Sequence, residues 1–169
     1  AKIAGMTITE LLQQEFAEES ASTRRMLERV PEGSFAWKPH AKSMTLGRLA
    51  SHVADLPNRC VTIATTDTFV RNPGTAPFQA GSAAELLAHF DEAAGAANAA
   101  LSALREDQLS GTWTLKFGEQ TMVALPRALA LRRVFLNHLI HHRGQLGVYL
   151  RRLDVPVPGM YGPSADDAR

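Results

Sequence analysis

One stretch, Val134–Leu150, limits the fold most, because it combines the apolar spacing of a helix with three of the six histidines. Each residue of a helix turns the chain by about 100°, so His138 and His142 stand about one turn apart on one face. The same face carries four apolar or aromatic residues, Leu131, Phe135, Leu146 and Tyr149. Such a stripe is typical of a helix that faces a core, so both imidazoles are predicted to point inward.

Two inward imidazoles have more than one interpretation. Their ring nitrogens cost free energy in poor solvent unless hydrogen bonds or a metal ion satisfy them. A pair at i, i+4 can converge on one ion, but a metal site needs a further ligand from elsewhere. Alternatively, one or both rings bond a helix carbonyl or lie at the edge of the stripe. His141 could also replace one of the pair, because spacing alone does not choose between i, i+3 and i, i+4.

Three further segments show helical periodicity and start signals. Thr7–Glu10 and Ser82–Glu85 fit capping boxes, and Thr45 is a good N-cap for the segment between them. Pro57 should kink or briefly break that middle helix, because proline lacks a backbone N–H group. The predicted helices cover about residues 7–30, 45–63, 82–105 and 126–153.

These four amphipathic helices predict an all-α protein, a four-helix bundle in which residues 1–169 form a single domain. A long crossover connection with two prolines and two glycines, Arg71–Gly81, separates the second and third helices. Before the last helix, alternation in Trp113–Phe117 and a turn at Gly118 are compatible with a short hairpin, which would need support from a neighbour. The tail, residues 155–164, is expected to lie extended along the body.

His52, beside the apolar stripe of the second helix, is the natural third ligand for His138 and His142. The alternative is that His52 is a structural histidine. Asp55 lies three residues further on the same side, where its carboxylate could orient the ring or move a proton. The alternative for Asp55 is a solvated carboxylate.

Other polar residues have weaker assignments. Arg143 and Gln145 are candidates for contacts with the ligands or a substrate, with surface or interface positions as the alternative. His40, in a loop after proline, and His89, off the apolar stripe, are predicted to be exposed. Cys60 is expected to be a free core thiol, not a nucleophile, since no base lies beside it in the sequence.

Composition argues against several classes of partner. Eighteen basic and seventeen acidic side chains nearly cancel, and the chain has no long basic run. We therefore expect no nucleic-acid partner. No apolar run reaches the roughly 18 residues of a membrane span, and the start of the chain lacks a secretory leader. A soluble, cytoplasmic protein with no membrane partner is expected, in keeping with a single unpaired cysteine.

Four motifs in order carry a family resemblance. They are Trp37–His40, Ser43–His52, His138–Leu146 and Pro156–Asp166. Together they resemble the DinB/YfiT-like superfamily of bacterial four-helix proteins over nearly the whole chain.

This resemblance implies a bundle, a homodimer and a divalent metal held by three histidines. Carried over residue by residue, the ligands fall on His52, His138 and His142. His141 is then the neighbour that does not bind the metal.

An open three-histidine site suits zinc or nickel, either of which lowers the pKa of a bound water or thiol. Relatives with assigned roles include transferases that use low-molecular-weight thiols such as bacillithiol or mycothiol, a maleylpyruvate isomerase type and metal-dependent hydrolases. We therefore expect a metal-dependent enzyme, a thiol-dependent S-transferase or a hydrolase, with a small-molecule substrate. The alternative is a non-catalytic dimeric stress-response or small-molecule-binding module whose metal is structural.

Overall fold

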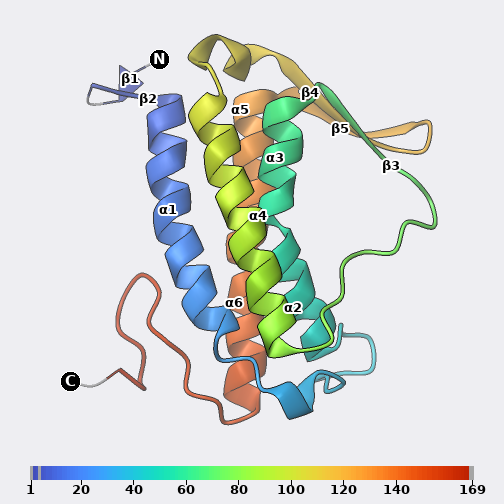
Figure 1. Ribbon diagram of the computed structural model, residues 1–169, viewed down its shortest axis with the longest axis vertical. Helices are drawn as coiled ribbons and strands as arrows, with labels where there is room; N and C mark the ends of the chain where they lie inside the picture. The colour runs from blue at the N-terminus through green and yellow to red at the C-terminus, as the bar shows by residue number, and fades with distance from the viewer. Residues whose placement is uncertain (1, 4, 168–169) are drawn as a thin grey trace.

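The computed structural model describes residues 2–3 and 5–167 and is mainly helical, with a small sheet near one end (Figure 1). The α-helices are α1 (Ile8–Leu27), α2 (Leu46–Asp55), α3 (Pro57–Thr65), α4 (Ala83–Ala103), α5 (Arg127–Ala130) and α6 (Asn137–Arg152). Two 3-10 turns are η1 (Glu32–Ser34) and η2 (Glu106–Ser110), and a π-helical turn, η3 (Leu131–Leu136), joins α5 to α6. The strands are β1 (Lys2–Ile3), β2 (Met6–Thr7), β3 (Thr68–Arg71), β4 (Thr112–Phe117) and β5 (Gln120–Pro126).

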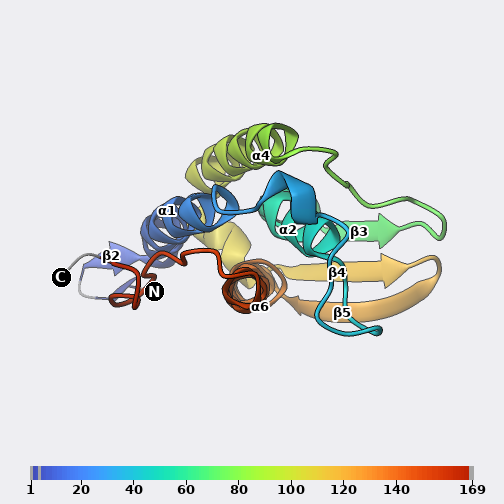
Figure 2. The same cartoon turned by 90° about the horizontal axis from the view of Figure 1, so that it is seen from below.

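All four predicted helical segments are present. They are α1, the pair α2 and α3, α4, and the run α5, η3 and α6. α1 contacts α4 and α6, and α2 contacts α4 and α6, so the segments pack side by side around a common core (Figure 2). Within the described part of the chain, no helix is both long and apolar enough to cross a bilayer.

One capping box forms in full and the other only by half. The Thr7 hydroxyl accepts from the Glu10 N–H at 3.2 Å, and the Glu10 carboxylate accepts from the Thr7 N–H at 2.7 Å. The Ser82 hydroxyl likewise accepts from the Glu85 N–H at 3.1 Å. The Glu85 carboxylate, however, accepts from the Gly81 N–H at 2.8 Å rather than from Ser82. The predicted reciprocal bond at the start of α4 is therefore wrong.

The predicted break at Pro57 is confirmed. α2 ends at Asp55, and Leu56 serves both as its C-cap and as the N-cap of α3. Pro57 occupies the first position of α3, where the absent N–H group costs nothing. His52 and Arg59 consequently lie on either side of this break.

The prediction of an all-α protein is confirmed only in part, because β3, β4 and β5 form a small three-stranded sheet beside the helices. The hairpin of β4 and β5 is the predicted one, with Gly118 in its turn at φ +56°. β3 pairs parallel to β4 and was not predicted. Three of the four β3 residues are exposed, so the strand has no alternating apolar pattern to reveal it. Besides β3, the fully buried ring of Trp113 supplies the support that the hairpin needs.

The core runs the length of the helices, and the segment before α2 closes one end of it. The Trp37 ring meets the Tyr149 ring edge-on at 5.7 Å, and the Tyr149 hydroxyl donates to the Met44 carbonyl at 3.3 Å. A Cβ atom at Gly47 would lie 2.9 Å from the Phe35 ring, so only glycine permits this close packing. Phe35 and Trp37 thus pack against the core and cover this end of it.

Arg143 and Glu19 form an ion pair of 2.5 Å inside the core, where they are 2 % and 6 % exposed. The Tyr161 hydroxyl donates to Glu19 at 2.6 Å and accepts from Arg143 at 3.0 Å. Arg143 also donates to the Glu19 carbonyl and the Thr23 hydroxyl. This buried cluster ties α6 to α1 and holds the tail against both.

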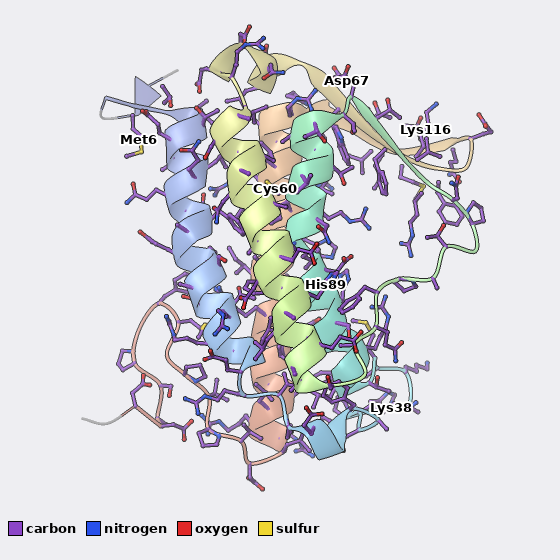
Figure 3. All side chains as sticks on the ribbon, in the orientation of Figure 1. Met6, Lys38, Cys60, Asp67, His89 and Lys116 are labelled. Atoms are coloured by element: carbon purple, nitrogen blue, oxygen red, sulfur yellow. The ribbon has the colours of Figure 1, made fainter. Side chains whose placement is uncertain are left out.

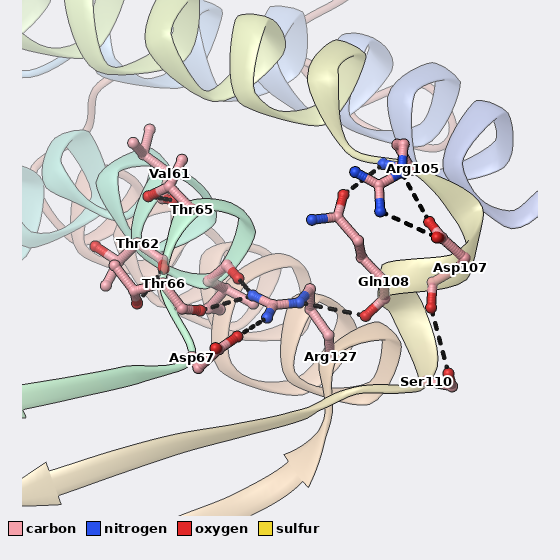
Figure 4. Close-up of polar contacts among 11 residues, drawn as sticks. Val61, Thr62, Thr65, Thr66, Asp67, Arg105, Asp107, Gln108, Ser110 and Arg127 are labelled. Carbon is pink, nitrogen blue, oxygen red and sulfur yellow. Dashed lines mark hydrogen bonds and ion pairs between the residues drawn. The ribbon is translucent and has the colours of Figure 1, made fainter.

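A second buried arginine, Arg127, satisfies backbone carbonyls near the end of α3 (Figure 4). Its Nη1 donates to the carbonyls of Ile63 and Thr66, and its Nε donates to the Gln108 carbonyl. Its Nη2 pairs with the Asp67 carboxylate, which is 87 % exposed. Helix ends leave such carbonyls without intrahelical partners, so Arg127 joins the sheet end of the molecule to α3.

We expect Arg127→Met to destabilise the protein by about 2–4 kcal/mol, because it leaves buried carbonyls unsatisfied. Asp67→Asn should cost about 0.5 kcal/mol or less, since solvent screens the exposed carboxylate. Urea unfolding followed by circular dichroism measures both. Equal losses of unfolding free energy in the two variants would show that Arg127 stabilises the protein through its ion pair with Asp67 and not through the buried carbonyls.

Candidate metal centre

Three histidines from two helices converge as predicted. His52 comes from α2, and His138 and His142 come from α6, which packs against α2. The Nε2 atom of His138 lies 2.9 Å from that of His142 and 3.3 Å from that of His52. One ligand atom from each ring lies within 4.8 Å of the others. The three half-buried rings therefore surround one point.

The hydrogen bonds of Nδ1 in two of these rings determine that Nε2 faces the point of convergence. Nδ1 of His142 lies 2.7 Å from the Gln145 amide oxygen, and Nδ1 of His138 lies 3.4 Å from the Val134 carbonyl. Because these oxygens only accept, each Nδ1 must donate its proton, which leaves the lone pair on Nε2. Two bare Nε2 atoms at this separation repel each other unless a cation lies between them.

Burial favours the neutral form of these three histidines. It lowers the pKa of His52 to about 4, with smaller contributions from His142 and His138. Burial is also the largest cause that lowers the pKa of His138 and of His142. Neutral imidazole is the form that binds metals.

The spacing suits a divalent transition metal. Two nitrogens that each lie about 2.0–2.1 Å from a tetrahedral zinc ion are about 3.3 Å apart. The Nε2 atom of His138 lies 2.9 Å from that of His142 and 3.3 Å from that of His52, which is close to this value. His52, His138 and His142 could therefore hold one metal ion.

The other predicted site residues on α6 separate into three cases. Gln145 contacts a candidate ligand directly, through the bond to His142. His141 is exposed, meets the His142 ring edge-on and does not belong to the group of converging nitrogens. Arg143 points into the core toward Glu19, so the structure places it away from the histidines.

Asp55 has partners other than His52. Its Oδ1 accepts from the Asn58 amide at 2.9 Å and from His89 Nε2 at 3.0 Å. Among the described contacts it does not orient the His52 ring, and its part in proton transfer stays a prediction.

The prediction that His89 is exposed is wrong. Its side chain is 24 % exposed and stacks on Phe78 with 3.6 Å between ring centroids. His89 lies on the part of α4 that the connection after β3 passes (Figure 3). Sequence periodicity could not reveal this contact, because it depends on where that long connection runs.

Sequence reasoning also missed two arginines beside the histidines. The charge of Arg48 helps to lower the pKa of His52 and His142, and the charge of Arg59 helps to lower that of His52 and His138, after the larger effect of burial. Arg48 precedes His52 by four residues, and Arg59 follows it by seven. This helical spacing was the available signal.

Cys60 is the predicted core thiol. It is fully buried, with Sγ 3.9 Å from the Ala97 carbonyl, and lies inside the helices (Figure 3). Burial raises the pKa of its thiol to about 12. Cys60 is therefore not available as a nucleophile in the folded protein.

Cys60 should not react with Ellman's reagent in the native protein at pH 8, because it is protonated and inaccessible. In concentrated urea, the same sample should release about one thionitrobenzoate per chain, in line with one cysteine. Rapid native reaction, with a rate above that of global unfolding, would contradict the burial of this thiol.

Fold and site together define a mainly helical protein with a three-histidine cluster between α2 and α6. The DinB family profile matches residues 6–169, so the chain belongs to the DinB family, as its motifs indicated. It is 27 % identical over 153 residues to the uncharacterized protein YrdA of Bacillus subtilis (strain 168), covering 88 % of this chain and 85 % of YrdA.

Two solved structures share the fold. A DinB-like protein from Bacillus cereus ATCC 10987 superposes with a TM-score of 0.71 at 24 % identity, over 89 % of this chain and 95 % of that one. The DinB-like protein YjoA of Bacillus subtilis gives a TM-score of 0.64 at 19 % identity, over 86 % and 95 % of the two chains.

Proposed function

We propose that this protein is a metal-dependent enzyme on a four-helix-bundle scaffold, with zinc or nickel at His52, His138 and His142. The observation that supports it is the convergence of three Nε2 atoms while Gln145 and Val134 occupy the Nδ1 atoms of two rings. When bound, the ion would supply the Lewis acidity that lowers the pKa of a thiol or a water.

An open site favours catalysis over a structural metal. Closed structural zinc sites have four protein ligands, whereas catalytic sites have three. Among residues 2–3 and 5–167, the group that could hold an ion contains three histidines and no carboxylate or thiolate. The remaining positions are then left for a substrate.

Thiol transfer is the reaction we propose, with a low-molecular-weight thiol as one substrate and hydrolysis as the related alternative. An attacking water needs a general base more than a thiolate does. Asp55 is the carboxylate available for this role, and its Oδ1 already accepts from Asn58 and His89. Proton transfer by Asp55 therefore belongs to the hydrolytic alternative.

We also propose that the protein acts as a homodimer in solution. α6 carries Val148, which is 64 % exposed, and α5 carries Leu129, which is 54 % exposed. Sedimentation equilibrium of the purified protein tests this proposal, and a mass of one chain at micromolar concentration would contradict it.

Elemental analysis of tag-free protein should find about one zinc or nickel ion per chain. His138→Ala should lose the metal, since it removes the ring that is close to both other ligands. His141→Ala is the matched control and should keep it. A metal-free wild type that cannot be reloaded would exclude the proposed enzyme and favour the non-catalytic module.

Gln145→Leu should weaken metal binding by about 10-fold to 100-fold, because the amide holds His142 in its tautomer and orientation. Competition with a chromophoric chelator measures this affinity. Gln14→Leu, at an exposed position on α1, serves as the control and should bind like the wild type. Unchanged affinity in Gln145→Leu would show that the bond to His142 does not organise the site.

A further inference from the structure

A cleft of about 220 Å³ lies between α3 and the segment formed by β3 and the connection that follows it. Figure 1 shows this connection running along the outside of the helices from the sheet to the start of α4. Arg59 and Thr62 of α3, and Phe69 and Arg71 of β3, line the cleft. Nothing in the proposed metal chemistry explains why two arginines meet there.

Arg59 is partly buried without an acceptor. Its guanidinium lies 5.1 Å above the centroid of the Phe69 ring, which fixes its position. Among the described residues, no hydrogen bond or ion pair involves its side chain, although other partly or fully buried arginines such as Arg127 and Arg143 have several. A partly desolvated guanidinium whose N–H groups donate to none of the described residues points to an external acceptor.

The guanidinium of Arg71 adds a second positive charge to the cleft, which is unfavourable when no anion is bound there. The exposed Arg71 lines the same cleft and, within the described part of the chain, forms no ion pair. Burial lowers the pKa of Arg59, the charge of Asp55 raises it in part, and the charge of Arg71 lowers it further. Asp55 is the one carboxylate among the lining residues, and its Oδ1 accepts from Asn58 and His89.

One arginine that lines the cleft, Arg59, lies close enough to the histidine cluster for its charge to act there. Arg59 follows His52 by seven residues, about two helical turns, across the break at Pro57. Its charge acts on both His52 and His138. A molecule seated on Arg59 could therefore extend to the histidines.

A further positive charge near the cluster comes from Arg48, four residues before His52. Arg48 acts on His52 and His142, and its buried Nη1 has no hydrogen-bond partner among the described residues. A divalent ion at the three histidines would add two more positive charges. Such a centre attracts anions over distances of about a Debye length and repels cations.

We propose that this cleft binds an oxyanion group of the substrate, a carboxylate or a phosphate, on Arg59 and Arg71. The substrate is then a small acidic molecule whose reacting end lies at His52 and His138. Guanidinium groups suit this purpose, because their planar N–H pairs match the two oxygens of such groups. The orientation of the substrate rests on the proposed function, whereas anion binding in the cleft does not.

The first arm of the test uses cobalt-substituted protein at low ionic strength. Thiol binding is followed by absorption for ω-mercapto carboxylic acids of three to eight carbons, each compared with the neutral mercapto alcohol of the same length. At the best length, the acid should bind about 10-fold to 100-fold tighter than the alcohol. Arg59→Met should remove this advantage and leave the affinity of the alcohol unchanged.

Two further variants serve in this arm, one as a control and one as a replacement for Arg59→Met. Arg105→Met, at an exposed ion pair with Asp107 beyond the end of α4, should retain the full advantage of the acid. Arg71→Met changes an exposed side chain and replaces Arg59→Met if circular dichroism shows that the latter is unfolded.

The second arm does not need the metal. In the His138→Ala variant, the arginine Nε–Hε signals are recorded by ¹⁵N–¹H NMR while sodium acetate or inorganic phosphate replaces chloride at constant ionic strength. The Arg59 and Arg71 signals should shift and saturate, and the Arg105 signal should not. The anion with the lower dissociation constant identifies the group as a carboxylate or a phosphate.

The outcomes separate the two proposals. Equal binding of acid and alcohol at every length, or an Arg59 signal that neither anion shifts, would overturn the acidic substrate while leaving a thiol-binding metal site intact. If the cobalt protein binds no thiol at all, the proposed function fails and the NMR arm alone decides. Saturable shifts at Arg59 would then still establish the cleft as an anion site.

Discussion

The burial of three imidazoles between α2 and α6 is the constraint on which the rest of the site depends. Half-buried rings remain neutral, and neutral rings must place their Nδ1 protons on acceptors before their Nε2 atoms can face one another. Gln145 and the Val134 carbonyl provide two of these acceptors. Tyr149 helps to hold α6 against α2. Its hydroxyl donates a hydrogen bond to the Met44 carbonyl just before α2, and its ring contacts Trp37.

Much of this arrangement could be predicted from the sequence, because it follows from local rules. Helical spacing brings His138 and His142 to one face, and an apolar stripe turns that face inward. The same helical spacing places His52 beside the apolar stripe of α2, which faces the protein core. A proline interrupts any helix in whose interior it occurs. The break between α2 and α3 at Pro57 could therefore be predicted without knowledge of the fold.

The rest depends on partners that are distant in the sequence. Hydrophobic periodicity predicts that a charged residue is exposed. Arg143 is nevertheless buried, because it pairs with Glu19, which lies 124 residues earlier in the chain. β3 is a strand because β4 lies beside it, and not because its own residues alternate. His89 and Asp55 form a pair only once α4 packs near the end of α2. For the same reason, the cleft beside Arg59 has no signature in the sequence.

The π-helical turn η3 has a consequence for the register of the last helix. A π-helical turn contains one residue more than the α-helical turns around it, and such an extra residue is a common way to change the facing of a helix partway along its length. Leu131 and Phe135 in this turn keep their places in the core, and Phe135 meets the Phe16 ring at 5.0 Å. The turn therefore sets the direction in which the histidines that follow project, relative to these hydrophobic contacts. Removing one residue from this turn would rotate the whole of α6 by about 100° relative to α5 and carry His138 and His142 away from His52.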